Sequence, residues 1–294
     1  MRLLSYQTEA GPRIAVKRGD DWVAVHQADP QLPTRMRDLL ALGEEGLAKV
    51  RDAAARGVLL DAGQLQRLAP VPDPQKVICV GLNYADHAAE SGAEIPAEPV
   101  IFSKFPTAIA GPDDRVLLPA ESSQVDYEAE LVVVIGRAGR HIRADQAFRY
   151  IAGYTCGHDV SARDWQLRKP GGQWLLGKTF DTFAPLGPEL VTADEIEHPG
   201  QLDIQLRLNG RTMQQSNTRQ LIFPIDQLFA YISQVCTLLP GDVIFTGTPP
   251  GVGAARKPPV FLQPGDVAEV EIERLGVLRN SFTQLGEDGS VRTQ

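Results

Sequence analysis

The chain has 294 residues, of which 43% are hydrophobic, and it carries a formal net charge of -8 at pH 7. A chain of this length can bury a substantial core, and its acidic balance argues against nucleic acid or an anionic membrane as the main partner. No apolar run approaches the roughly 20 residues that span a bilayer, and residues 1–13 lack a signal-peptide hydrophobic region, so we expect a cytoplasmic protein. The three cysteines (Cys79, Cys156 and Cys236) lie far apart without a paired zinc-type spacing, which favours buried thiols in a reducing compartment.

Residues 1–70 are predicted to form a small N-terminal α+β domain. Hairpin-like strands are expected at residues 13–16 and 22–25, followed by a helix over about 36–55. The proline-rich segment 69–74 is typical of a linker or a crossing strand, so we place the domain boundary there and assign residues 71–294 to a second domain.

Beyond the boundary, short apolar strands alternate with glycine and proline turns. The expected strands are residues 76–80, 99–103, 130–135, 202–208, 242–246 and 267–272. Only two helices, 144–150 and 225–238, are predicted between them, which is too few to cover both faces of a doubly wound parallel sheet. The fold class is therefore predicted to be mostly β with some α, an α+β protein of rolled or barrel-like architecture.

An acidic pair precedes the most apolar of these strands. Side chains alternate between the faces of a strand, so Glu128 and Glu130 point the same way, about 7 Å apart along the chain. Two carboxylates at the mouth of an apolar strand repel each other unless a cation lies between them, which favours a divalent metal site. The alternative is a solvated strand end. Asp159 follows another apolar segment and offers a third carboxylate, which would complete an all-oxygen site suited to Mg2+ or Mn2+.

Three further segments carry polar groups suited to catalysis or anion binding. His87 and Glu90 are three residues apart in a helix-compatible segment, where the carboxylate could orient the imidazole as a base, although any surface helix can carry such a pair. Lys178 follows the glycine-containing loop 171–177, and the segment 246–253 offers backbone amides and hydroxyls. Neither loop matches a nucleotide-binding pattern, and a plain structural turn is the alternative for the second.

Taken together, the segments 80–87, 127–130, 159–164, 174–178 and 245–249 resemble the fumarylacetoacetate hydrolase family, and the similarity spans about residues 75–273. The resemblance implies a β-roll catalytic domain, a homodimer, and a Mg2+ or Mn2+ ion held by Glu128, Glu130 and Asp159. It implies a water-activating dyad of His87 and Glu90, with Lys178 near the metal. It also implies that three further side chains face the substrate: Arg163, Gln166 and Thr248. A supporting role for Asp126 stays open.

The resemblance implies a reaction as well. We expect a metal-dependent hydrolase that cleaves the C3–C4 bond of a 2,4-dioxo acid, an acylpyruvate or a 2,4-diketo-3-deoxy sugar acid, to pyruvate and a carboxylic acid. Within the family the same pocket also serves oxaloacetate decarboxylation or tautomerisation and hydroxymuconate-type isomerisation, which are the alternatives. A third alternative is a protein that binds an oxo acid without turning it over.

Overall fold

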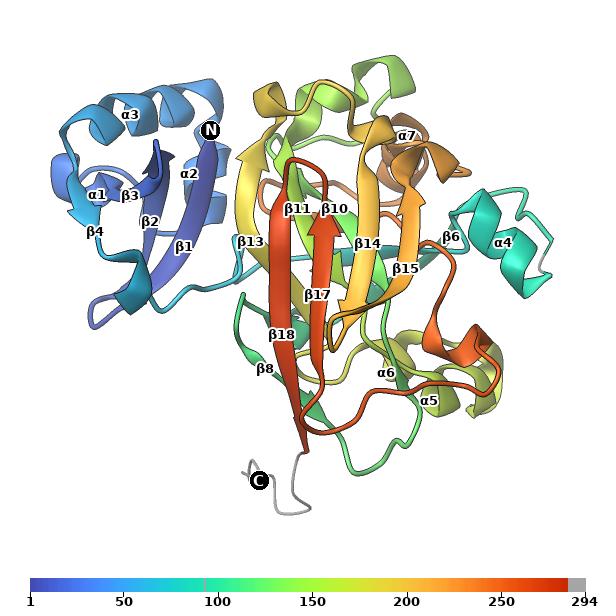
Figure 1. Ribbon diagram of the computed structural model, residues 1–294. Coiled ribbons are helices and arrows are strands. Elements are labelled where there is room, and N and C mark those ends of the chain that lie inside the picture. The colour runs from blue at the N-terminus through green and yellow to red at the C-terminus, as the bar shows by residue number, and fades with distance from the viewer. Residues whose placement is uncertain (93, 285–294) are drawn as a thin grey trace.

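The computed structural model describes residues 1–92 and 94–284 and has an α+β architecture built around two packed sheets (Figure 1). The larger sheet has the strand order β4-β3-β2-β1-β13-β11-β10-β16-β5-β6, with β7 paired to β13, and the smaller has the order β15-β14-β17-β18-β8. A short pair joins β12 to β9. The predicted fold class is confirmed, with a β-rich body and a smaller N-terminal unit beside it.

The N-terminal unit contains four strands and three helices. These are β1 (Arg2–Thr8), β2 (Gly11–Arg18), β3 (Asp21–Ala24), α1 (Val25–Ala28), α2 (Met36–Ala41), α3 (Gly43–Arg56) and β4 (Val58–Leu60). The single helix expected over 36–55 is wrong in one respect, because Gly43 takes a φ of +59° and divides it into α2 and α3. β1 pairs with β13 at Arg2 and Leu3, so the unit extends the main sheet at one end.

The body of the molecule contains the remaining strands and helices. Its strands are β5 (Val77–Gly81), β6 (Val100–Lys104), β7 (Ile109–Ala110), β8 (Arg115–Leu118), β9 (Val125–Asp126), β10 (Ala129–Ile135), β11 (Ile151–His158), β12 (Ser161–Ala162), β13 (Ala184–Thr192), β14 (Asp203–Leu208), β15 (Arg211–Asn217), β16 (Val243–Phe245), β17 (Val267–Ile272) and β18 (Gly276–Gln284). Its α-helices are α4 (Ala85–Ser91), α5 (Arg163–Arg168), α6 (Leu175–Lys178) and α7 (Ile225–Val235). The helix expected at 144–150 is a 3-10 helix, Ala144–Tyr150, that packs against α7.

Strand β10 lies at the centre of the fold and is buried on both faces. Leu131 and Val133 enter the core between the two sheets, whereas Val132 and Val134 enter a second core that includes residues of α2. A strand covered on both sides carries a continuous apolar run, as β10 does. The carboxylates at its N-terminal end are consequently carried into the interior.

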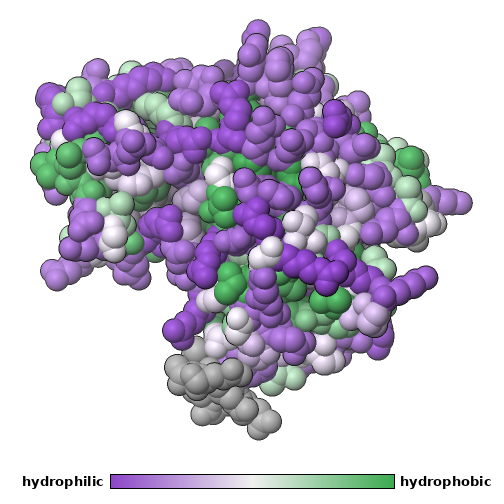
Figure 2. Space-filling view, in the orientation of Figure 1, coloured by the Kyte–Doolittle hydropathy of each residue, from purple (hydrophilic) through white to green (hydrophobic). Residues whose placement is uncertain are grey.

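The surface is ordinary for a folded domain. The face shown in Figure 2 is largely hydrophilic, and its hydrophobic residues lie in small groups. Across residues 1–92 and 94–284, the helices are all too short or too polar to cross a bilayer.

Candidate active site

Three buried carboxylates meet where β10 begins and β11 ends. Glu128, Glu130 and Asp159 each offer a carboxylate oxygen, and these oxygens all lie within 4.8 Å of one another. The antiparallel register pairs Ala129 with His158, and the backbone N–H of Asp159 donates to the Glu128 carbonyl at 2.9 Å. The sheet therefore fixes the convergence that the sequence pattern alone only suggested. Their role as metal ligands stays a prediction.

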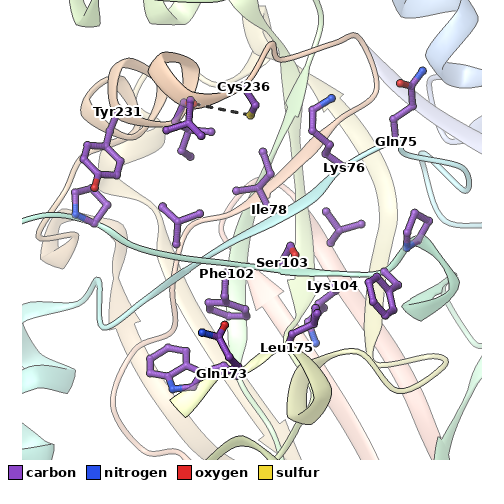
Figure 3. A pocket seen from close by; sticks show the side chains of 18 residues that line it. Gln75, Lys76, Ile78, Phe102, Ser103, Lys104, Gln173, Leu175, Tyr231 and Cys236 are labelled. Atoms are coloured by element: carbon purple, nitrogen blue, oxygen red, sulfur yellow. Dashed lines mark hydrogen bonds between the residues drawn. The ribbon is translucent and has the colours of Figure 1, made fainter. Parts of the chain in front are cut away.

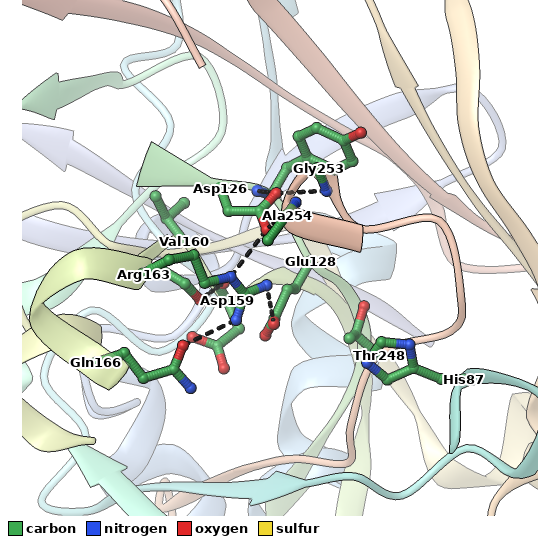
Figure 4. A network of polar contacts seen from close by, with 12 residues as sticks. His87, Asp126, Glu128, Asp159, Val160, Arg163, Gln166, Thr248, Gly253 and Ala254 are labelled. Atoms are coloured by element: carbon green, nitrogen blue, oxygen red, sulfur yellow. Dashed lines mark hydrogen bonds and ion pairs between the residues drawn. The ribbon is translucent and has the colours of Figure 1, made fainter. Parts of the chain in front are cut away.

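Two cations bind Glu128 inside this site. Lys178 Nζ donates to Glu128 Oε2 at 2.7 Å and to Asp159 Oδ2 at 2.8 Å. Arg163 Nη2 donates to Glu128 Oε1 at 2.6 Å (Figure 4). Burial raises the pKa of Glu128, but Lys178 and Arg163 outweigh burial and hold that pKa well below its usual range. Burial lowers the pKa of both cations, but Asp159 and Glu128 raise the pKa of Lys178 above its ordinary value, and Glu128 and Asp126 do the same for Arg163, so both keep their protons.

Glu130 is in a different electrostatic position. Its Oε2 accepts a hydrogen bond from the Gly247 N–H at 2.7 Å. Burial raises the pKa of Glu130 well above its ordinary value, and the negative charges of Asp159 and Glu128 raise it further. An ionised Glu130 therefore needs additional positive charge close by, which a divalent cation among the three carboxylates would provide.

Lys104 is a site residue that the sequence reasoning missed. Its ammonium group is fully buried, lies 2.6 Å from Asp159 Oδ1, and donates to the carbonyls of Val160, Phe183 and Lys178. The sequence did contain an indication, because a single lysine directly follows the predicted strand 99–103. A lysine at such a position can be buried only if other groups pair with its charge. Lys104 and Lys178 thus pair with different oxygens of the Asp159 carboxylate, Oδ1 and Oδ2 respectively.

Asp126 supports the site from one side, which answers the question that the sequence left open. Its Oδ2 accepts from Arg163 Nε at 2.8 Å, and its carboxylate also accepts from the N–H groups of Gly253 and Ala254 at 2.7 and 3.0 Å (Figure 4). A Cβ on Gly253 would lie 1.8 Å from the carbonyl oxygen of Val260, so only glycine fits there. Asp126 therefore fixes both Arg163 and the 253–254 loop.

The charges of the site favour a hard cation. Four buried carboxylates (Asp126, Glu128, Glu130 and Asp159) outnumber three buried cations (Lys104, Arg163 and Lys178). The three triad residues offer only oxygen ligands, which match the preference of Mg2+ and Mn2+ over zinc or copper. The residues present fit a divalent ion in both charge and donor type.

His87 and Glu90 lie on α4, as the sequence spacing predicts for a helical i, i+3 pair. His87 Nδ1 is 3.3 Å from Glu90 Oε2, and the Gly251 N–H donates to the same Glu90 oxygen at 2.9 Å. Glu90 therefore orients the imidazole and ties α4 to the loop that follows β16. Figure 4 shows His87 beside Thr248, on the side of Glu128 away from Arg163. The water-activating role of the pair stays a prediction.

The remaining predicted substrate contacts also lie in the pocket. Gln166 Oε1 accepts from Arg163 Nη1 at 2.9 Å. The Thr248 hydroxyl donates to the Ala129 carbonyl at 2.9 Å and accepts from Gln214 Nε2 at 2.9 Å. Its proton is therefore already used, and it can bind a ligand only by accepting a hydrogen bond on its second lone pair. Gln214, on β15, is a second residue that the sequence reasoning missed.

These side chains line a cavity of about 390 Å3. Its wall includes the three carboxylates, the two cations Arg163 and Lys178, His87 and Thr248, together with apolar side chains such as Phe102 and Trp174. A small cavity with cations and a candidate metal site suits a short, anionic oxo acid.

Comparison with known proteins agrees with this geometry. The chain is 51% identical over 285 residues to the oxaloacetate tautomerase FAHD2A, mitochondrial, of Bos taurus, with 95% of this chain and 91% of the relative covered. Among solved structures, a fumarylacetoacetate hydrolase from Exiguobacterium antarcticum matches with a TM-score of 0.84 and 35% identity, covering 96% of this chain and 99% of that one. A maleylpyruvate hydrolase from Sphingobium sp. SYK-6, solved with manganese(II) ion and pyruvate, matches with a TM-score of 0.80 and 32% identity, covering 97% and 99%.

The comparison contradicts one expectation from the sequence and favours one of the stated alternatives in another. The relative from Bos taurus is named as a mitochondrial protein, which contradicts the predicted cytoplasmic location. The prediction failed because charge and hydropathy exclude a membrane-spanning segment but do not distinguish between aqueous compartments. The relative's name also favours the tautomerase alternative over the hydrolase that we expected first.

The family model described as fumarylacetoacetate (FAA) hydrolase C-terminal matches residues 76–283, and the chain belongs to the fumarylacetoacetate hydrolase family.

Proposed function

We propose that this protein catalyses the enol–keto tautomerisation of oxaloacetate, with Mg2+ or Mn2+ bound by Glu128, Glu130 and Asp159. The observation that carries the proposal is the buried carboxylate triad in a cavity of about 390 Å3, in a chain that is 51% identical to an oxaloacetate tautomerase. The cavity size suits a four-carbon dicarboxylate, and the cations along its wall match the charge of that substrate.

A divalent cation bound at the triad would act as a Lewis acid that withdraws electron density from the oxygen on C2, which lowers the barrier to moving a proton between that oxygen and C3. Arg163 is fixed by Asp126 and Glu128 and would hold a substrate carboxylate together with Gln166. The Lys178 ammonium group lies beside two of the triad carboxylates and would stabilise negative charge that develops on the substrate oxygen. Thr248 would contribute an acceptor at the opposite wall.

The test is the rate at which enol oxaloacetate converts to the keto form, followed by the loss of enol absorbance. We expect acceleration by the wild type with Mg2+ or Mn2+, loss of that acceleration with a chelator, and loss of it in Glu130→Gln. The matched control is Glu197→Gln, because Glu197 is an exposed glutamate outside the cavity. A wild type that does not accelerate the conversion with either metal overturns the proposal.

Hydrolysis of a 2,4-dioxo acid is the second candidate, and the His87–Glu90 pair favours it. An imidazole whose Nδ1 faces a carboxylate at 3.3 Å is suited to accept a proton from water. Tautomerisation moves a proton between the enol oxygen and C3 without an attacking water, so only hydrolysis requires the pair to activate one. A screen of acylpyruvates and diketo sugar acids, with released pyruvate as the readout and with and without chelator, tests this activity directly.

The homodimer and the division at residue 70 are also proposals. Light scattering on the purified protein gives the mass in solution, and a monomer at micromolar concentration would contradict the dimer. Limited proteolysis tests the domain boundary, because the segment between β4 and β5 contains a single 3-10 turn, Ala62–Gln64, and no α-helix. Cleavage there with release of a folded C-terminal fragment is the expected result.

A further inference from the structure

Two aromatic side chains separate the active-site cavity from a larger cleft. The cavity has a volume of about 390 Å3 and the neighbouring cleft about 820 Å3, and Phe102 and Trp174 line both. Their rings are in edge-to-face contact, with centroids 5.5 Å apart. We infer that Trp174, supported by Phe102, limits the length of the oxo acid that the site accepts. The inference rests on the proposed function, because it concerns the substrate of the same cavity.

The position of Trp174 depends on a glycine. A Cβ built on Gly81, at the end of β5, would lie 2.4 Å from Trp174 Cζ3. The indole therefore lies directly against the backbone of residue 81, at a distance that no other residue permits. Close packing on one side and the Phe102 ring on the other restrict the movement of the indole away from the cavity.

The aromatic wall stands at the reacting end of the cavity. Phe102 belongs to β6, and Lys178 Nζ lies 5.0 Å from the centroid of its ring. The same ammonium group binds Glu128 and Asp159. A substrate held at the triad therefore lies close to this wall. Carbon atoms that extend the substrate toward the wall would meet Phe102 and Trp174.

The cleft beyond the wall suits an alkyl chain and not a second carboxylate. Its lining includes Ile101 and Val235, together with Ile78, which is labelled in Figure 3. Both lysines of the lining are already paired, Lys76 with Asp242 at 2.7 Å and Lys104 with Asp159 at 2.6 Å. Removal of the indole would join the two cavities and admit 2-oxo acids with unbranched alkyl tails.

The test compares the dissociation constants of pyruvate, 2-oxohexanoate and 2-oxooctanoate in the presence of Mg2+, measured by calorimetry for the wild type, Trp174→Ala and Trp174→Phe. We expect Trp174→Ala to improve the binding of 2-oxooctanoate relative to pyruvate by about tenfold or more, a change of the size that a few methylene groups in an apolar pocket produce. Trp174→Phe should lie between. The control is Leu176→Ala, on the short helix that Trp174 precedes, because Leu176 is 54% exposed and lines neither cavity.

The inference is overturned if the dissociation constants of the three acids stand in the same ratios in the wild type and in Trp174→Ala. It is also overturned if the wild type already binds 2-oxooctanoate more tightly than pyruvate. If Trp174→Ala fails to fold by circular dichroism, Trp174→Phe decides, and an unchanged profile in that variant counts against the wall. Binding is measured without turnover. A wild type that does not tautomerise oxaloacetate therefore refutes the proposed function alone, and the chain-length profile still tests the wall.

Discussion

Replacement of Lys104 by methionine removes one ammonium group from the interior and leaves the volume of the side chain almost unchanged. In the wild type this group is fully buried, pairs with Asp159 at 2.6 Å, and donates to the carbonyls of Val160, Phe183 and Lys178. Burial lowers the pKa of Lys104, and Asp159 opposes that effect. The variant leaves a buried carboxylate with one cation fewer and three carbonyls without this donor.

The expected loss of stability follows from these contacts. Removing one partner of a buried ion pair costs about 3–5 kcal/mol, because the other charge stays buried without compensation. Each carbonyl left unsatisfied would cost about 1–3 kcal/mol by itself, but the four effects overlap and do not add. We therefore expect the free energy of unfolding to fall by about 3–5 kcal/mol, a large part of the 5–15 kcal/mol typical of a folded protein.

The measurement is urea unfolding at pH 7 in the presence of a chelator, followed by tryptophan fluorescence. The matched control is Lys76→Met, because Lys76 directly precedes β5, the strand paired with β6, and forms an ion pair with Asp242 at 2.7 Å. Its side chain is 28% exposed, and the buried Asp242 keeps a backbone N–H donor on each carboxylate oxygen, from Lys76 at 3.0 Å and from Leu239 at 2.8 Å, so we expect a smaller loss than for Lys104→Met. Equal losses in the two variants, or a loss below about 1 kcal/mol for Lys104→Met, would refute the reasoning.

Three further predictions concern single side chains. Lys178→Ala should lower turnover more than about tenfold, because it removes one of the two cations paired with each of Glu128 and Asp159, and near-normal steady-state kinetics would contradict this. His87→Ala should abolish any release of pyruvate from acylpyruvates while oxaloacetate tautomerisation persists; pyruvate release that survives would show that His87 is not the base. His158 is fully buried, and burial, with a smaller effect of Lys104, lowers its pKa to about 3. The unfolded chain therefore takes up this proton first as the pH falls below about 6.5, so stability is lost between about pH 6.5 and 3. Between pH 7 and 4.5, urea unfolding should show that the wild type loses about 2–3 kcal/mol more than His158→Leu, whereas parallel losses would exclude His158 as the cause.

Local patterns in the sequence were sufficient for part of the fold and site. The continuous apolar run at 131–135 predicts a buried strand, and β10 is buried on both faces. The three-residue spacing of His87 and Glu90 predicts a contact on a helix, and their side chains meet on α4. In both cases the residues concerned are neighbours in the chain, so strand or helix geometry alone sets their distance.

Other features depend on segments that are far apart in the sequence. The register between β10 and β11 decides that Asp159 lies beside Glu128, and the pairing of β6 with β5 carries Lys104 into the interior. The two backbone N–H groups that bind Asp126 come from Gly253 and Ala254, in the segment after β16, and its guanidinium partner Arg163 comes from α5. The spacing of the carboxylates limited the predicted metal ligands to oxygen, and the resemblance to a known family implied an oxo-acid substrate. Tertiary structure decided which charges meet and where the cavity ends, because long-range strand pairing and close packing, which periodicity does not encode, set those distances.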